Sequence, residues 1–128
     1  MAAEREEREI LRIIEDYAGA WETGEAERFA RLFWTEDPSF SVVENDRPYP
    51  LGAEYIEMLV GEIRKAGPGP SNQRFHDTTV YWVTSEIAYS VSLRDELNTQ
   101  MTSRVTFVYE KKGDEWGIIH GHFSFVPE

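Results

Sequence analysis

The histidines are the first candidates for chemistry in this sequence, because an ordinary imidazole changes charge near neutral pH. His120 and His122 lie two residues apart in the stretch EWGIIHGHFSF. On an extended chain two such side chains leave by the same face, so they form a candidate metal-binding pair. A zinc or iron site needs a third ligand, and His76 is the one remaining histidine.

The last hairpin decides which side chains accompany this pair. If Gly113 and Asp114 form its tip, Arg104 lies opposite Phe123. Thr106 and Gly121 then share the face of Arg104, and Val105, Phe107, His120 and His122 point the other way. The register therefore places Arg104 beside aromatic side chains, where it is either an ordinary salt-bridge residue of the strand or a cation that contacts a ligand.

A second hairpin places His76. If Thr84 and Ser85 close it, His76 shares a face with Tyr89, together with Thr78, Val80, Val91 and Leu93. This face carries Arg104 and is opposite to that of His120 and His122. The sequence therefore predicts no metal site and no cofactor, and it predicts a sheet-face or dimer-interface role for the histidine pair.

The elements that position these residues follow from the hydrophobic periodicity. Apolar residues at three- and four-residue spacing predict helices near residues 4–22, 25–33 and 53–65. Alternating patterns and turn residues predict strands near residues 39–43, 74–83, 86–95, 101–111 and 115–126. Helices followed by an antiparallel meander indicate an α+β fold in a single domain over residues 1–128, with helices covering one face of the sheet.

Composition narrows the partners. The chain has 128 residues, a formal net charge of −11 and no cysteine, so it repels phosphate backbones and forms no disulfide. Neither a signal peptide nor an apolar run of about 20 residues is present in the sequence. We therefore expect a cytoplasmic protein that binds neither nucleic acid nor membranes.

Three strings resemble the nuclear transport factor 2-like superfamily, especially its SnoaL-like members. They are YAGAWETGEAERFARLF, GAEYIEMLV and SRVTFVYEKKGDEWGIIHGHFS, and the resemblance extends over nearly the whole chain. It implies a cone-shaped fold, in which three N-terminal helices pack on a curved antiparallel sheet around an apolar pocket. It also implies a homodimer formed through the sheet face.

Two branches of this superfamily can be compared residue by residue. Against ketosteroid isomerase, Tyr17 matches the oxyanion-binding tyrosine, but the general base falls near Ser41 or Val42 and the second acid near Arg104 or Val105. That mechanism is therefore not supported. Against the association domain of calcium/calmodulin-dependent protein kinase, Arg104 matches one pocket arginine, whereas two others fall on Val91 and Phe123.

Two functions stay open on these grounds. An isomerase, cyclase or dehydratase would use Tyr17 as hydrogen-bond donor and His76 as proton shuttle. A non-catalytic ligand-binding or oligomerisation module would need neither. In both, the ligand is a small apolar or carboxylated molecule, and the candidate ligand-binding residues are Arg104, Trp21, Trp34, Tyr55, Tyr89 and Phe123. An ionisable acid–base group inside the pocket would favour the enzyme.

Overall fold

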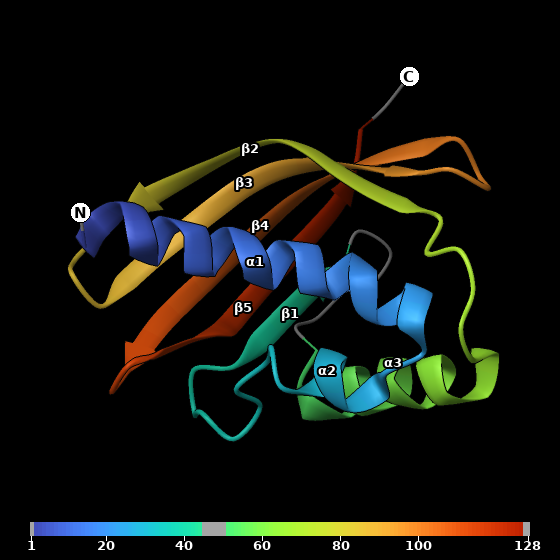
Figure 1. Ribbon diagram of the computed structural model, residues 1–128, viewed down its shortest axis with the longest axis horizontal. Helices are drawn as coiled ribbons and strands as arrows, with labels where there is room; N and C mark the ends of the chain where they lie inside the picture. The colour runs from blue at the N-terminus through green and yellow to red at the C-terminus, as the bar shows by residue number, and fades with distance from the viewer. Residues whose placement is uncertain (1, 45–50, 127–128) are drawn as a thin grey trace.

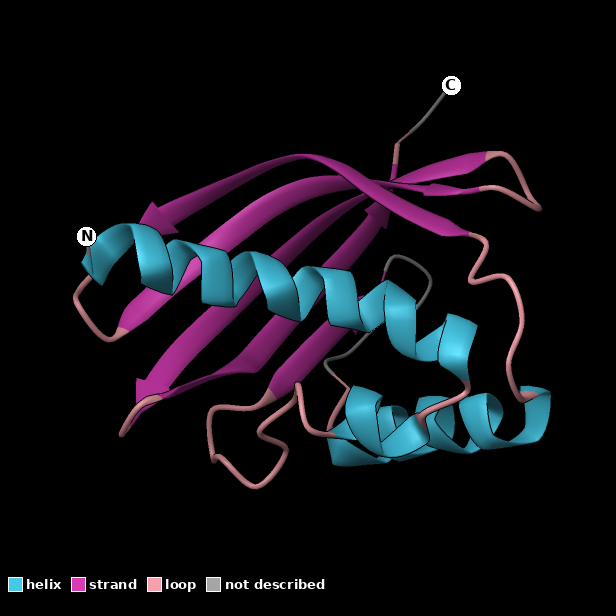
Figure 2. Cartoon of the chain, in the orientation of Figure 1, coloured by secondary structure: helices cyan, strands magenta, loops and turns pink. Residues whose placement is uncertain are grey.

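The computed structural model describes residues 2–44 and 51–126, which form three helices and five strands. The helices are α1 (Ala2–Thr23), α2 (Ala26–Ala30) and α3 (Ala53–Ala66). The strands are β1 (Ser41–Glu44), β2 (Gln73–Trp82), β3 (Ile87–Glu96), β4 (Met101–Lys112) and β5 (Glu115–Phe125). The helices and strands lie in separate layers, which confirms the predicted α+β class (Figure 2). None of the described helices is long and apolar enough to cross a membrane.

The five strands form one curved sheet in the order β1-β5-β4-β3-β2. The strands from β2 to β5 pair antiparallel with their neighbours, as the tight turns predict. The short strand β1 differs from the predicted meander, because it joins the edge of the sheet parallel to β5, with Val42 beside Gly121. The sheet is therefore mixed and mostly antiparallel.

Helix α1 lies across the concave face of the sheet, and α2 and α3 pack against each other near its C-terminal end (Figure 1). The buried residues Ile10, Ile13, Ile14 and Tyr17 form the apolar stripe that faces the sheet. Gly24 ends α1 with a φ of +73°, and a Cβ there would approach the backbone nitrogen of Pro68 at 2.8 Å. The chain therefore needs glycine at this turn.

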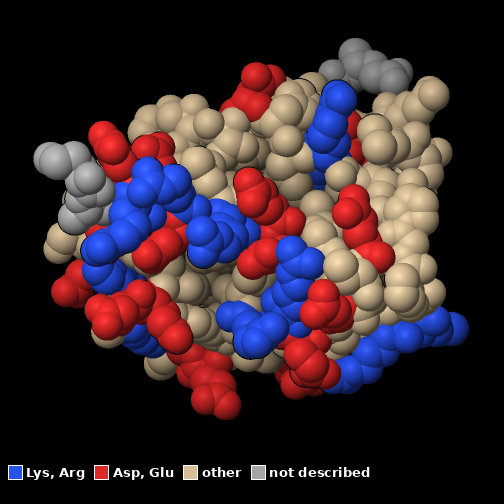
Figure 3. All heavy atoms as spheres, in the orientation of Figure 1, with Lys and Arg blue, Asp and Glu red and all other residues tan. Residues whose placement is uncertain are grey.

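Ion pairs tie the helices to their neighbours. Arg28 of α2 donates to Asp16 of α1 at 2.6 Å, and Glu6 of α1 pairs with Lys111 of β4. On the face that carries α1, acidic and basic side chains are interspersed (Figure 3). Such partly exposed pairs contribute about 0–1 kcal/mol each, so most of the stability comes from the apolar layer between helix and sheet.

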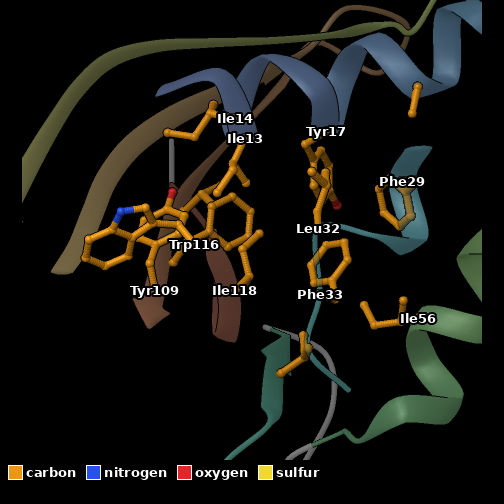
Figure 4. Packing of buried hydrophobic residues seen from close by; sticks show 14 of the residues in the cluster. Ile13, Ile14, Tyr17, Phe29, Leu32, Phe33, Ile56, Tyr109, Trp116 and Ile118 are labelled. Atoms are coloured by element: carbon orange, nitrogen blue, oxygen red, sulfur yellow. The ribbon is translucent and has the colours of Figure 1, made fainter. Parts of the chain in front are cut away.

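That layer is rich in aromatic side chains. Phe29, Phe107 and Tyr109 are at most 1% exposed. Figure 4 shows Trp116 beside Tyr109 and Ile13, whereas Tyr17 projects from α1 further along, beside Phe33. The side of the core near Tyr17 is the side that α2 and α3 close.

A β-bulge changes the predicted register of the last hairpin. Next to the tip the pairing is as expected, with Lys112 opposite Glu115, but the register shifts by one residue between Val108 and Tyr109. Arg104 consequently lies opposite Ser124, so its predicted pairing with Phe123 is wrong. The extra residue lies in β5, so beyond it Phe123 shares the inner face with Val105 and Phe107, which are buried in the core and not on the outer face.

A second bulge affects the hairpin of β2 and β3. His76 lies opposite Leu93 as predicted, but the register shifts between His76 and Thr79. Val80 then pairs with Ser90, whose side chain is buried, so the predicted common face of Val80 and Tyr89 is also wrong. The inner face of β3 is the one with small polar residues, and Tyr89 lies on the outer face.

Candidate functional site

Arg94 is the cation inside the described part of the cone. It lies on the inner face of β3, opposite Phe75 and Ser103, and its side chain is 12% exposed. The guanidinium donates to Glu96 at 3.3 Å and to Ser103 at 3.4 Å, and it lies 4.9 Å from the ring centre of Phe123. These hydrogen bonds are long for a charged donor, so Arg94 keeps the capacity to bind a further acceptor.

Tyr17 lies next to this guanidinium at the centre of the core. It is 4% exposed and its ring contacts five others, those of Phe29, Phe33, Phe75, Phe107 and Phe123. Burial raises the pKa of the Tyr17 phenol, while the charge of Arg94 and a hydrogen bond from it act in the opposite direction. The phenol is therefore neutral at ordinary pH and able to donate a proton in a hydrogen bond.

A carboxylate and a second phenol complete the group. Tyr55 of α3 donates a hydrogen bond to the Glu44 carboxylate at the end of β1. Burial raises the pKa of Tyr55, and the bond to Glu44 raises it further. Negative charge on Glu44 also raises the pKa of Tyr17. We call Tyr17, Glu44, Tyr55, Arg94 and Glu96 the interior polar cluster.

Small residues on β3 make room for this cluster. Ala88, Ser90 and Ser92 precede Arg94 on the same inner face, and all three are buried. Their side chains are short, and the hydroxyl of Ser90 is bonded to that of Tyr109 at 2.7 Å. Arg94 is the first long side chain on this face, so its head reaches beneath α1 toward Tyr17.

The arrangement brings together the parts of an acid–base site. The neutral phenol of Tyr17 can donate to a ligand oxygen, and the charge of Arg94 can stabilise negative charge that develops there. The Glu44 carboxylate can accept a proton. Tyr17 and Arg94 lie among aromatic rings, where electrostatic interactions are stronger than in water.

Four predicted site residues lie in or beside the cluster. Tyr17 and Tyr55 belong to it, Phe123 carries the guanidinium of Arg94 on its ring, and Trp21 lies one turn beyond Tyr17 on α1. Arg104 does not lie there. Its side chain is exposed on the outer face of β4, because the extra residue of the bulge lies in β5 and puts Phe123 opposite Val105 instead of Arg104.

His76 and Tyr89 also lie outside the cone interior, contrary to their predicted face. The two ring nitrogens of His76 face Asp77 at 2.9 Å and Asp95 at 3.1 Å. Asp95 and Asp77 raise the pKa of His76. Tyr89 stacks on Tyr81 at a ring separation of 4.9 Å.

Trp34 lines a different hollow. A surface cleft of about 530 Å³ lies between the segment 33–38 and Lys112. The Lys112 ammonium lies 5.0 Å from the Trp34 ring and donates to Asp37 at 2.7 Å. The Trp34 indole packs so closely on Gly117 that a Cβ there would lie 2.1 Å from it. Trp34 is therefore a packing residue of the β5 edge.

The histidine pair lies on the outer sheet face. His120 is within 2.8 Å of the Ser41 hydroxyl, and His122 is exposed. Burial lowers the pKa of His120, and the neighbouring charge of His122 lowers it further. Within residues 2–44 and 51–126, no group of three acidic or histidine side chains could hold a metal ion.

Sequence reasoning missed Glu44 and Arg94. The alternation of inward and outward residues along β1 and β3 could have identified both residues. Val42 and Glu44 share one face of β1, and Arg94 continues the row of Ser90 and Ser92 on β3. The hydrophobic face of β3 is the outer one, so choosing the more apolar row as the inner face gives the wrong result.

Comparisons with known proteins give the family. An NTF-2-like protein of unknown function from Shewanella oneidensis is 18% identical, with a TM-score of 0.71 over 91% of this chain and 97% of that one. Another such protein, from Silicibacter pomeroyi, is 14% identical, with a TM-score of 0.71 over 98% of this chain and 100% of that one. A "putative ketosteroid isomerase" from Parabacteroides distasonis is 19% identical, with a TM-score of 0.63 over 89% of this chain and 85% of that one.

At these identities the solved structures establish the fold and not an activity. No curated protein matches the chain. The SnoaL-like domain family matches residues 10–128. The chain therefore belongs to the SnoaL-like domain family and has the nuclear transport factor 2-like cone fold.

Proposed function

We propose that this protein binds a small apolar molecule carrying a carbonyl group and moves a proton on it. One observation carries the proposal: a neutral phenol, a guanidinium and a carboxylate from three separate elements lie close enough for the two charges to change the pKa of the phenol. A proton-transfer site requires a donor for the oxygen that gains charge and a base for the carbon that loses a proton.

Tyr17 is the donor in this proposal. Its ring is fixed on all sides by other aromatic rings, so its hydroxyl is preorganised. A substrate carbonyl that replaces the contact between Tyr17 and Arg94 would accept a hydrogen bond from the phenol. As the enolate forms, the positive charge of Arg94 stabilises the oxygen that becomes negative.

Glu44 is the base. The bond from Tyr55 holds its carboxylate in one orientation at the end of β1. The carboxylate of a ketosteroid isomerase-type site was expected near Ser41 or Val42, and here it would come two residues later, on the same face as Val42. The fold shared with the Parabacteroides protein agrees with this chemistry by analogy alone.

Exchange of α-protons for deuterium tests the proposal without knowledge of the natural substrate. We expect the protein in D₂O to accelerate deuterium incorporation into 2-tetralone, measured by proton NMR, with saturation in ketone concentration. Tyr17→Phe keeps the aromatic packing and removes the donor, so its rate should fall by about 10²–10³. A wild-type rate equal to that of buffer would overturn the proposal.

A non-catalytic binding module is the second candidate. It is favoured by the mutual pairing of the cluster, in which Tyr55 is bonded to Glu44 and Arg94 to Glu96. Such internal pairing satisfies buried charges without a substrate. Ligand binding that depends on Tyr17, together with no α-proton exchange in any ketone, is the result expected for this candidate.

We also propose that two copies associate through the outer sheet face. Of the residues that the sequence suggested for this interface, His120 lies on the outer face, whereas Val105, Phe107, Tyr109 and Ile118 are buried in the core. Tyr81 is 46% and Val91 40% exposed, and both lie on this face beside Tyr89. Sedimentation at micromolar concentration should give a dimer, and Val91→Lys should shift it toward the monomer. A wild-type monomer would contradict this.

A further inference from the structure

Five buried side-chain atoms in the described part of the chain lack a hydrogen-bond partner. They are Trp21 Nε1, Gln73 Oε1, His76 Nε2, Arg94 Nε and Trp116 Nε1. His76 Nε2 faces Asp95 at 3.1 Å, so an ion pair accounts for it. Buried polar atoms are nearly always paired in native proteins, so each of the other four requires an explanation.

Three of these four atoms come from one end of the cone. Gln73 lies opposite Glu96, and Arg94 lies opposite Phe75, so the two are diagonal neighbours on the inner face. The Tyr17 ring lies 5.5 Å from that of Phe75. α1 runs antiparallel to β2, and its end lies near the start of β2 (Figure 1). Trp21, one turn after Tyr17, therefore belongs to the same end of the cone as Gln73, and its ring lies 6.0 Å from that of Phe29.

The unpartnered atoms differ in kind. Trp21 Nε1 and Arg94 Nε are donors, and Gln73 Oε1 is an acceptor. We propose that Trp21, Gln73 and Arg94 form a polar subsite that recognises an uncharged ligand group with both lone pairs and a hydrogen, namely a carboxamide or a hydroxyl. This inference rests on the proposed function, because the subsite adjoins Tyr17 and would hold the far end of the same ligand.

The sequence suggested a carboxylated ligand, but the charges around this subsite argue against a carboxylate there. Arg94 is the single cation of the interior polar cluster, and Glu96 and Glu44 both belong to it. Glu96 already pairs with Arg94, so a carboxylate ligand would compete with Glu96 for the guanidinium. It would also leave Gln73 Oε1 without a donor, whereas a carboxamide satisfies the donors and the acceptor together.

A set of matched ligands tests the subsite. The probes are 2-naphthol, whose hydroxyl stands in for an enol at Tyr17, and its carboxamide, hydroxymethyl and carboxylate derivatives at ring positions 5 to 7. Affinities are measured by calorimetry, and the indole N–H signals are followed by ¹H–¹⁵N NMR. Trp116→Phe is the matched control, because Trp116 Nε1 is also buried and unpartnered but lies beside Ile13 and Tyr109, away from Tyr17.

We expect the best carboxamide or hydroxymethyl probe to bind about 5- to 30-fold more tightly than both 2-naphthol and the carboxylate, the range for one or two added hydrogen bonds. The Trp21 indole signal should shift on binding, and Trp21→Phe and Gln73→Leu should each abolish most of the preference. Trp116→Phe should preserve it.

Other results overturn the inference. A preference for the carboxylate probe, or equal affinities for all the probes, would overturn it. A Trp21 indole signal that no bound probe shifts would also overturn it, because that is the result for a subsite filled by water alone. Failure of the proposed catalysis is separate, because it appears as absent deuterium exchange while the Trp21-dependent preference persists. Binding of no probe at all would exclude the subsite, even if 2-tetralone exchange were observed.

Discussion

Replacement of Arg94 by methionine separates the interior cation from its exposed neighbour on β4. Arg94→Met keeps the aliphatic stem and removes the charge that lies on Phe123 and beside Glu96. Loss of the cation–π contact costs about 0.5–2 kcal/mol. The Glu96 side chain is 27% exposed and hydrates when left unpaired, so its cost is well below the roughly 3–5 kcal/mol of a fully buried pair.

Together these effects predict a loss of about 2 kcal/mol in the free energy of unfolding. For a chain of 128 residues this corresponds to a fall of about 7 °C in Tm. Urea denaturation followed by circular dichroism, and calorimetry, measure the two quantities. Arg104→Met is the matched control, since Arg104 is exposed on the outer face, and it should change stability by about 0.5 kcal/mol or less.

The comparison refutes the account in either of two ways. If Arg104→Met is as costly as Arg94→Met, Arg104 does not lie exposed on the outer face of β4. If Arg94→Met unfolds at the wild-type urea concentration, Glu96 does not depend on the guanidinium and the interior polar cluster is not electrostatically coupled.

Two further predictions concern packing and protonation. Gly117→Ala should destabilise the protein by about 3 kcal/mol or prevent folding, because the new methyl group would overlap Trp34. Gly61→Ala has no other atom within 4 Å of the new methyl group, so it should stabilise α3 by about 0.5–1 kcal/mol. Denaturant unfolding measures both changes. An NMR titration of the imidazole protons measures the pKa of each histidine. The pKa of His76 should lie above the ordinary value of about 6.5, because Asp95 and Asp77 favour the charged form. The pKa of His120 should lie below that value, because burial disfavours the charge. The raised pKa of His76 contributes stability that is complete below about pH 6.5 and is lost as pH rises through the folded pKa, so His76→Asn should cost more at pH 6 than at pH 9. Reversal of the two histidines, or equal costs for the two glycines, would contradict these assignments.

The periodicity of the sequence was sufficient for α1 and the four long strands. The stripe from Ile10 to Tyr17 predicts α1, and the alternating runs predict the four long strands within one or two residues of their ends. The parallel pairing of β1 with β5 was not predicted, because four residues carry no information about a partner more than 70 positions away. The family resemblance, not the periodicity, gave the cone shape.

The candidate site was predicted in part. A cation against the Phe123 ring was expected and is present, but it is Arg94 rather than Arg104. The cause is a single bulge, since one unpaired residue in β5 exchanges the two faces of everything beyond it. Bulges leave no reliable mark in one sequence, and Ile118 and Ile119 would fit either face.

The most direct test of the central claim is the rate of α-proton exchange in Glu44→Gln. The amide keeps the size of the side chain and its ability to accept the bond from Tyr55, but it cannot take up a proton from carbon. The account predicts that this variant binds 2-naphthol and unfolds like the wild type, while its exchange of 2-tetralone protons falls by about 10²–10⁴. Glu54→Gln, an exposed change on α3, should keep the full rate. Exchange by Glu44→Gln at the wild-type rate would contradict the account.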